Sequence, residues 1–170
     1  ARALGIDLSG VEDVVLSHNH QDHTGGLIAL RRELMEANPD ALSRAYVAPA
    51  IFAARRNGPA YWTSMAEKRR EFEALGGEFV LVEAPREVMP GLWLTGPPPR
   101  RHEESSMLPL AKVEVELDGA WQLDTVPEDM PLVAVTTDGV FLLTGCGHSG
   151  LVNNVLYAQK LTGARVKGAI

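Results

Sequence analysis

The stretch His18-Asn19-His20-Gln21-Asp22-His23-Thr24-Gly25-Gly26 decides how this chain is interpreted, because it holds three of the five histidines. It directly follows residues 11–17 (VEDVVLS), a short run rich in β-branched side chains that predicts a buried strand. Residues two apart in extended backbone point to the same side, so His18 and His20 can bind one ion together. The stretch therefore predicts a metal-binding loop at the end of a strand.

The same loop offers ligands for a second ion, since Asp22 and His23 are adjacent and their side chains diverge. Nitrogen and oxygen ligands without thiolates suit zinc, iron or manganese, so we predict one or two divalent ions, with zinc favoured. A structural zinc site closes four ligands, often with cysteine. A loop at a strand end is instead a typical place for an active site.

Composition limits the alternatives. The chain has 170 residues, a formal net charge of −6, 45% hydrophobic and 22% charged residues, which predicts one globular domain over 1–170. The acidic balance argues against a nucleic-acid partner, because phosphate binding needs a basic surface. No apolar run is long enough to span a membrane. Cys146 is the one cysteine, so no internal disulfide forms and a reducing cytoplasm is expected.

Strand and helix patterns alternate along the chain, which predicts an α/β protein. We expect Thr24 to cap a helix over 25–38, Ser64 and Glu67 to form a capping box, and Ser149 to cap a helix that ends at Gly163. The last of these helices should bury the apolar face of Leu151, Val152, Val155 and Leu156. A short helix is predicted over 49–56. Strands are predicted over 45–48, 79–82, 92–95, 113–117, 132–136, 140–144 and 165–170. Asp138-Gly139 predicts a hairpin between 132–136 and 140–144, and the last two strands with the helix between them predict a strand–helix–strand unit.

His18-x-His20-x-Asp22-His23 followed by Thr24-Gly25-Gly26 resembles the motif of the metallo-β-lactamase fold superfamily. A second stretch, 143–153 (LTGCGHSGLVN), is similar to a T-G-C-S-H-x-G-[IL]-x-N stretch of one branch. That branch includes the dihydropterin–ribofuranosylaminobenzene phosphate synthases and many metallohydrolases. Residues 95–100 (TGPPPR) resemble its T-G-x-I-P-R segment, with Pro98 in place of Ile, and Gly147 stands where Ser is usual.

The resemblance implies an αββα sandwich, two facing sheets with helices outside. It also implies that His148 completes the first metal site with His18 and His20, while Asp22 and His23 serve the second. The expected activity is a metal-dependent hydrolase acting on a small-molecule substrate, with Asp22 orienting the metal-activated water. In the synthase-like alternative, the site activates a pyrophosphate leaving group for carbon–carbon bond formation.

Family members carry further strands upstream, with an Asp-Thr-Gly turn, and a final histidine downstream. We therefore expect this chain to be part of a longer protein, incomplete at both ends. A metal-binding remnant without catalysis, or a di-iron redox role, are the other hypotheses.

The sequence leaves the roles of three residues near these motifs open. Cys146 stands at a strand end from which it could approach a metal, although a lone cysteine is more often inert. Arg100 could meet a substrate phosphate. His102 lies among Arg and Glu residues that favour a solvated loop. Substrate-binding residues and the oligomeric state are not predicted.

Overall fold

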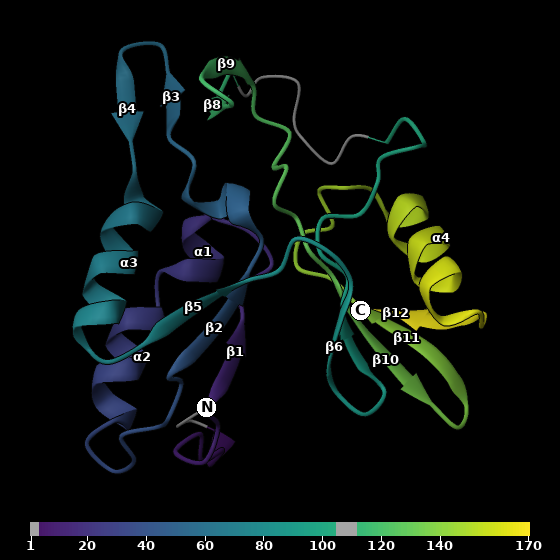
Figure 1. Ribbon diagram of the computed structural model, residues 1–170, viewed down its shortest axis with the longest axis horizontal. Helices are drawn as coiled ribbons and strands as arrows, with labels where there is room; N and C mark the ends of the chain where they lie inside the picture. Colours follow the sequence, from purple (N-terminus) through teal and green to yellow (C-terminus); the bar gives the residue numbers. More distant parts are fainter. Residues whose placement is uncertain (1–3, 105–111) are drawn as a thin grey trace.

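The computed structural model describes residues 4–104 and 112–170. Its elements form four layers: the helices α1–α3, a first sheet, a second sheet and the helix α4 (Figure 1). This is the αββα arrangement of the predicted metallo-β-lactamase sandwich, so the predicted fold class is confirmed.

The first sheet is parallel and has the order β1-β2-β5. Its strands are β1 (Asp13–Val15), β2 (Arg44–Val47) and β5 (Glu78–Leu81). On its outer side lie α1 (Gln21–Thr24), α2 (Leu27–Leu34) and α3 (Ser64–Ala74). Leu27, Ile28 and Phe72 from the helices pack with Val47 and Phe79 from the sheet, so one apolar core joins these two layers.

The second sheet has the order β12-β11-β10-β7-β6. Its strands are β6 (Arg86–Met89), β7 (Leu92–Leu94), β10 (Leu132–Thr136), β11 (Gly139–Leu143) and β12 (Val166–Ala169). The β10–β11 hairpin turns at the predicted Asp138-Gly139 dipeptide. α4 (Leu151–Thr162) connects β11 to β12, which run parallel. The predicted strand–helix–strand unit is therefore present.

The two sheets bury a second core between them. Tyr46 and Val82 from the first side contact Leu94 and Met130 from the second. A third core joins the second sheet to α4 through Val133, Leu142 and Ala158. Three apolar interfaces between four layers are what a sandwich with helices on both outer faces requires.

A third, antiparallel sheet was not predicted. It has the order β4-β3-β8-β9 and lies beyond one end of the other two (Figure 1). Its strands are β3 (Arg55–Asn57), β4 (Ala60–Trp62), β8 (Glu114–Leu117) and β9 (Ala120–Leu123). The short helix predicted over 49–56 is only the 3₁₀ turn η2 (Pro49–Phe52), because the chain then pairs with β8 as strand β3.

The predicted helix caps were wrong. Thr24 is the last residue of α1, and its hydroxyl donates back to the His20 carbonyl at 3.1 Å. Ser64 is the first residue of α3 rather than its cap. Gly150 stands at the cap of α4, where the Glu104 carboxylate accepts the Val152 and Asn153 amides, each at 3.1 Å. A carboxylate from a distant loop therefore takes the role expected of Ser149.

The apolar face predicted to be buried on α4 is largely exposed. Leu151, Val152 and Leu156 keep 55%, 45% and 45% of their surface accessible. The buried positions of the helix are instead Asn153, Asn154 and Ala158. The two asparagines replace apolar contacts with hydrogen bonds to neighbouring loops. Among the described helices, none is long and apolar enough to cross a membrane.

Candidate metal centre

The first histidine loop connects β1 to α1. Leu16 still pairs with β2 through the Tyr46 carbonyl, so the backbone stays extended up to the loop. His18 is fully buried, and its Nδ1 lies 2.9 Å from Ser17 Oγ. Its other nitrogen, Nε2, lies 3.1 Å from His20 Nδ1. The predicted convergence of the two imidazoles is therefore present.

The second loop, between β11 and α4, brings His148 to the same place. The His148 ring centroid lies 4.7 Å from that of His18 and 4.8 Å from that of His20. One nitrogen from each of the three residues lies within 4.8 Å of the others. These are the three residues predicted to hold the first ion, drawn from two loops about 130 residues apart.

A second group shares His18 with the first. It adds His23 and Cys146, with donor atoms again within 4.8 Å of one another. His23 Nε2 lies 3.2 Å from the Cys146 sulfur and 3.4 Å from Asp22 Oδ2. The Asp22 side chain is 75% exposed, so it faces solvent beside His23.

The donor set fits a divalent ion. A tetrahedral zinc with bonds of about 2.0–2.1 Å to nitrogen separates its ligand atoms by about 3.4 Å. The 3.1 Å separation between His18 Nε2 and His20 Nδ1 is close to that value. Four imidazoles, one thiol and one carboxylate also offer the nitrogen, sulfur and oxygen donors that zinc accepts.

Burial keeps the imidazoles of His18 and His148 neutral. Desolvation, followed by the neighbouring imidazoles of His20, His23 and His148, lowers the pKa of His18 to about 3. Desolvation and the proximity of His20 also lower the pKa of His148. Neutral imidazole is the form that ligates metal, so the ligands are ready to bind at neutral pH.

The thiol of Cys146 responds in the opposite way. Burial, then the carboxylates of Asp22 and Asp129, raise its pKa, because each disfavours the thiolate. The thiol itself remains exposed. A cation between Cys146 and His23 would reverse this balance, since a coordinated thiol loses its proton.

One short segment, residues 128–130, holds both loops. A Glu128 carboxylate oxygen accepts the amide of Asn19, between His18 and His20, at 3.1 Å. The amide of Met130 donates to the Ser17 carbonyl at 3.0 Å. Asp129 accepts both the amide, at 2.8 Å, and the hydroxyl of Ser149. The relative position of the two histidine loops is thus fixed by three consecutive residues.

Glu128 is itself part of a buried ion network. Arg55, 1% exposed, donates to Glu128 at 2.7 Å and to Asp124 at 3.1 Å. Burial raises the pKa of Glu128 to about 6, against the opposing charge of Arg55. Arg55 also donates to carbonyls of Ala50 and Ala53 at the end of η2. The network therefore connects the metal loop to the third sheet.

Gly145 permits the close approach of the two loops. A Cβ at this position would overlap Ser17 Oγ and would lie 2.9 Å from Ser17 Cβ and 3.4 Å from His18 Nδ1. Contacts that short force a neighbour to move. Any larger residue here would push the second loop away from His18.

Sequence reasoning missed the residues that position the site. Arg55, Asp124, Glu128 and Asp129 were not singled out, and their partners lie far away in the sequence. A dense acidic group in 124–129 next to a predicted core strand was the available signal. Of the residues with open roles, Arg100 lies near the site: it donates to the Val126 carbonyl at 2.7 Å, and its charge is one of the causes that lower the pKa of His148. His102 is exposed in a loop that packs on α4.

Comparisons with known proteins agree with this fold. The model of the Metallo-beta-lactamase superfamily matches residues 1–37, which contain the first histidine loop. The chain also resembles the crystal structure of Tm1679, a metal-dependent hydrolase of the beta-lactamase superfamily. The TM-score is 0.71 and the identity 28%, over all of this chain and 60% of that one. The chain is therefore similar to this superfamily in sequence over residues 1–37 and in fold over its whole length.

Two curated proteins of Methanocaldococcus jannaschii are also similar. The first is 7,8-dihydropterin-6-methyl-4-(beta-D-ribofuranosyl)-aminobenzene-5'-phosphate synthase, 30% identical over 95% of this chain and 55% of its own length. The second, Uncharacterized protein MJ0448, is 28% identical over 95% of this chain and 57% of its own length. The chain thus spans little more than half the length of these relatives.

Proposed function

We propose that this chain carries the metal centre of a metal-dependent hydrolase that acts on a small molecule. The observation that supports it is the convergence of His18, His20 and His148 from two loops around one point. Three nitrogen donors leave a fourth position for water or substrate, as catalytic zinc sites do.

The first ion would be held by His18, His20 and His148. His23 and Asp22 would hold a second ion, with Cys146 as a further ligand, because its sulfur lies 3.2 Å from His23 Nε2. Zinc is the favoured metal, and iron or manganese suit the same nitrogen and oxygen donors. A bound ion would supply hydroxide at neutral pH by lowering the pKa of water to about 7.

The protein side chains then have separate tasks. The buried imidazoles fix the ion, and the Ser17 hydroxyl orients the His18 ring through Nδ1. Asp22, exposed beside His23, would orient the attacking water and accept its proton. Segment 128–130 would keep the relative position of the two loops constant during turnover.

Hydrolysis of model esters and phosphodiesters by the zinc-loaded chain tests this proposal. We expect turnover that requires metal and disappears in Asp22→Asn, while Asp40→Asn, an exposed acid on another loop, keeps it. Metal-loaded protein without any turnover would contradict catalysis and would leave the metal-binding remnant. A coloured, iron-loaded preparation with redox activity would contradict the hydrolytic assignment.

A second candidate is a synthase activity, and the similarity to the dihydropterin synthase of M. jannaschii over 95% of the chain favours it. The two candidates differ in what is released. Pyrophosphate release that depends on a dihydropterin co-substrate would support the synthase. Metal-dependent hydrolysis without such a requirement would support the hydrolase.

A further inference from the structure

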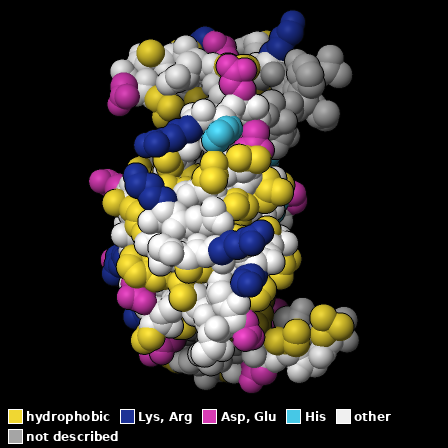
Figure 2. Space-filling view, turned by 90° about the vertical axis from the view of Figure 1, so that its right-hand side faces the viewer, with side chains coloured by type: hydrophobic (Ala, Val, Ile, Leu, Met, Phe, Trp, Pro, Cys, Tyr) yellow, Lys and Arg dark blue, Asp and Glu magenta, His cyan; other side chains and the backbone are white. Residues whose placement is uncertain are grey.

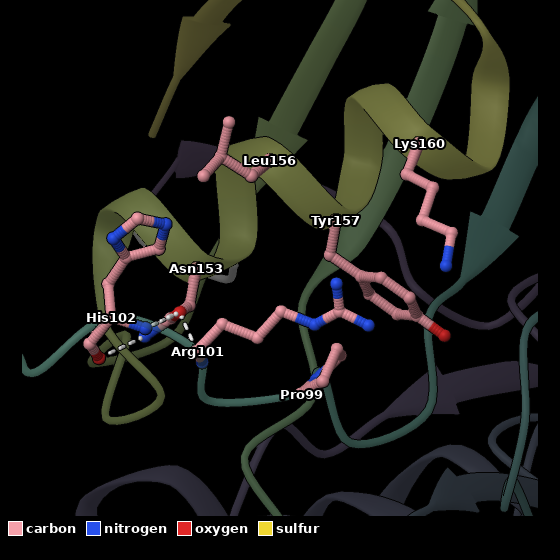
Figure 3. Close-up of a pocket in the computed structure, with 7 residues that line it drawn as sticks. All are labelled: Pro99, Arg101, His102, Asn153, Leu156, Tyr157 and Lys160. Carbon is pink, nitrogen blue, oxygen red and sulfur yellow. Dashed lines mark hydrogen bonds between the residues drawn. The ribbon is translucent and has the colours of Figure 1, made fainter.

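A second concave surface lies outside the histidine cluster. It is a cavity of about 200 Å³ between residues 99–102 and the outer side of α4 (Figure 3). From α4 it is lined by Asn153, Leu156, Tyr157 and Lys160, which are three or four residues apart and therefore share one face of the helix. Leu156 belongs to the apolar face that was predicted to be buried, and it is 45% exposed.

The wall opposite the helix is fixed by Asn153. This side chain is 3% exposed, and its oxygen accepts the amides of Arg101 and His102, each at 2.9 Å. Its nitrogen donates to the carbonyls of His102 and Ser149 at 3.0 and 2.8 Å. Three of these four hydrogen bonds hold the loop on the helix, and the fourth goes to Ser149 before the helix. The cavity is therefore preformed.

The lining combines positive charge with apolar surface. Arg101 comes from the loop and Lys160 from the helix, and in Figure 3 both side chains extend toward the Tyr157 ring. Leu156 and Pro99 add aliphatic surface to the lining. Figure 2 shows the face of the molecule that carries α4, where Lys and Arg side chains lie among hydrophobic ones.

No carboxylate lines this cavity within the part of the chain that the structure describes. The nearby Glu104 is engaged by the first amides of α4. Across residues 4–104 and 112–170, no ion pair involves Arg101 or Lys160. Within the cavity, the charges of Arg101 and Lys160 are therefore not neutralised by a lining carboxylate. They leave the cavity suited to an anion.

We propose that this cavity binds a small organic anion, in which a phosphate or carboxylate group is attached to a ring. Arg101 and Lys160 bind the anionic group, for which a guanidinium and an ammonium provide charge-assisted hydrogen bonds. Tyr157, Leu156 and Pro99 contact the ring. The site does not depend on the metal centre, although Asn153 connects it to Ser149, the residue after His148.

Titration of the ¹⁵N-labelled chain with phenyl phosphate tests the proposal, with amide shifts as the readout. We expect saturable shifts at Arg101, His102 and Asn153. Arg101→Ala and Lys160→Ala should each weaken binding by about tenfold or more, and the double variant should abolish it. Arg70→Ala, an exposed arginine on α3, makes the same change in net charge and should leave the affinity unchanged.

Further ligands separate the contributions. Inorganic phosphate and phenol each lack one half of the proposed ligand and should bind at least about tenfold more weakly. Benzoate carries a carboxylate where phenyl phosphate carries a phosphate. The ligand of these two that binds more tightly identifies the preferred anionic group. The proposal would be overturned if phenol bound with the same affinity as phenyl phosphate. It would also be overturned if the double variant bound phenyl phosphate with unchanged affinity.

The titration is repeated with His20→Ala. Identical shifts in this variant show that the cavity and not the metal centre holds the anion. If His20→Ala lost both its metal and the amide shifts, the anion would bind at the histidines. That result would contradict a separate site. Failure of the proposed hydrolase activity would leave this result unaffected.

Discussion

The two loops that carry the histidines are built in different ways. The first continues directly from a strand into α1, and its ligands are crowded into six residues, 18–23. The second is a glycine-rich turn with one histidine, His148, between β11 and α4. Local backbone geometry is enough to pair His18 with His20, but only tertiary contacts bring His148 to them.

Segment 128–130 supplies those contacts, and it holds each of the two loops through different residues. The first loop is tied through Glu128, which also bears a buried ion pair, and through the Met130 amide. The second loop is held by Asp129, which accepts the amide and the hydroxyl of Ser149. Removing either acid should therefore damage a different half of the metal centre, and by a different amount.

Glu128→Ala should have the largest effect. It leaves the buried Arg55 guanidinium without one of its two carboxylates and removes the acceptor of the Asn19 amide. Loss of one partner from a buried pair costs about 3–5 kcal/mol. Urea unfolding should show this loss, with Glu36→Ala, an exposed acid, as the control. A Glu128→Ala chain as stable as that control would contradict the role of the network.

Asp129→Ala should have a smaller effect on folding and a larger one on the second loop. It leaves the buried Ser149 amide and hydroxyl without their carboxylate, which costs about 1–3 kcal/mol in unfolding free energy. Since His148 precedes Ser149, zinc affinity should fall about tenfold or more. Competition with a chromophoric chelator measures this. Unchanged zinc affinity would show that Asp129 does not position His148.

The pH dependence of stability should be the mildest effect. Because the pKa of His18 falls from 6.5 to about 3 in the folded chain, the unfolded chain binds more protons between these values. Stability from His18 is therefore complete above about pH 6.5 and is lost as the pH falls toward 3. The difference between metal-free wild type and His18→Asn, measured by urea unfolding, isolates this slope. Parallel stability curves would contradict a buried, neutral His18.

The contrast between the loops also explains which features could be predicted from the sequence. The first loop, the β10–β11 hairpin and the β11–α4–β12 unit were predicted because each is encoded within one short stretch. His148 was assigned only through resemblance to a family. No sequence pattern in residues 145–150 predicts that the His148 ring lies 4.7 Å from that of His18.

The errors have physical causes of the same kind. α4 was oriented by its apolar residues, but Asn153 is buried because the amides of the distant residues Arg101 and His102 bond its side-chain oxygen. Asn154 is buried beside Ser149, whose hydroxyl donates to it. Residues 55–57 form a strand because β8, almost sixty residues later, pairs with them. Glu128 was overlooked because its partners, Arg55 and Asn19, lie 73 and 109 residues away.

Zinc binding by His20→Ala, His148→Ala and the double variant decides whether both loops serve one ion. If they do, each single change should lower the affinity of the tighter site by about a hundredfold or more, and the double variant should lose little beyond that, since ligands of one ion are not additive. Full zinc content in His148→Ala, or losses that add in the double variant, would show that the two loops do not share an ion.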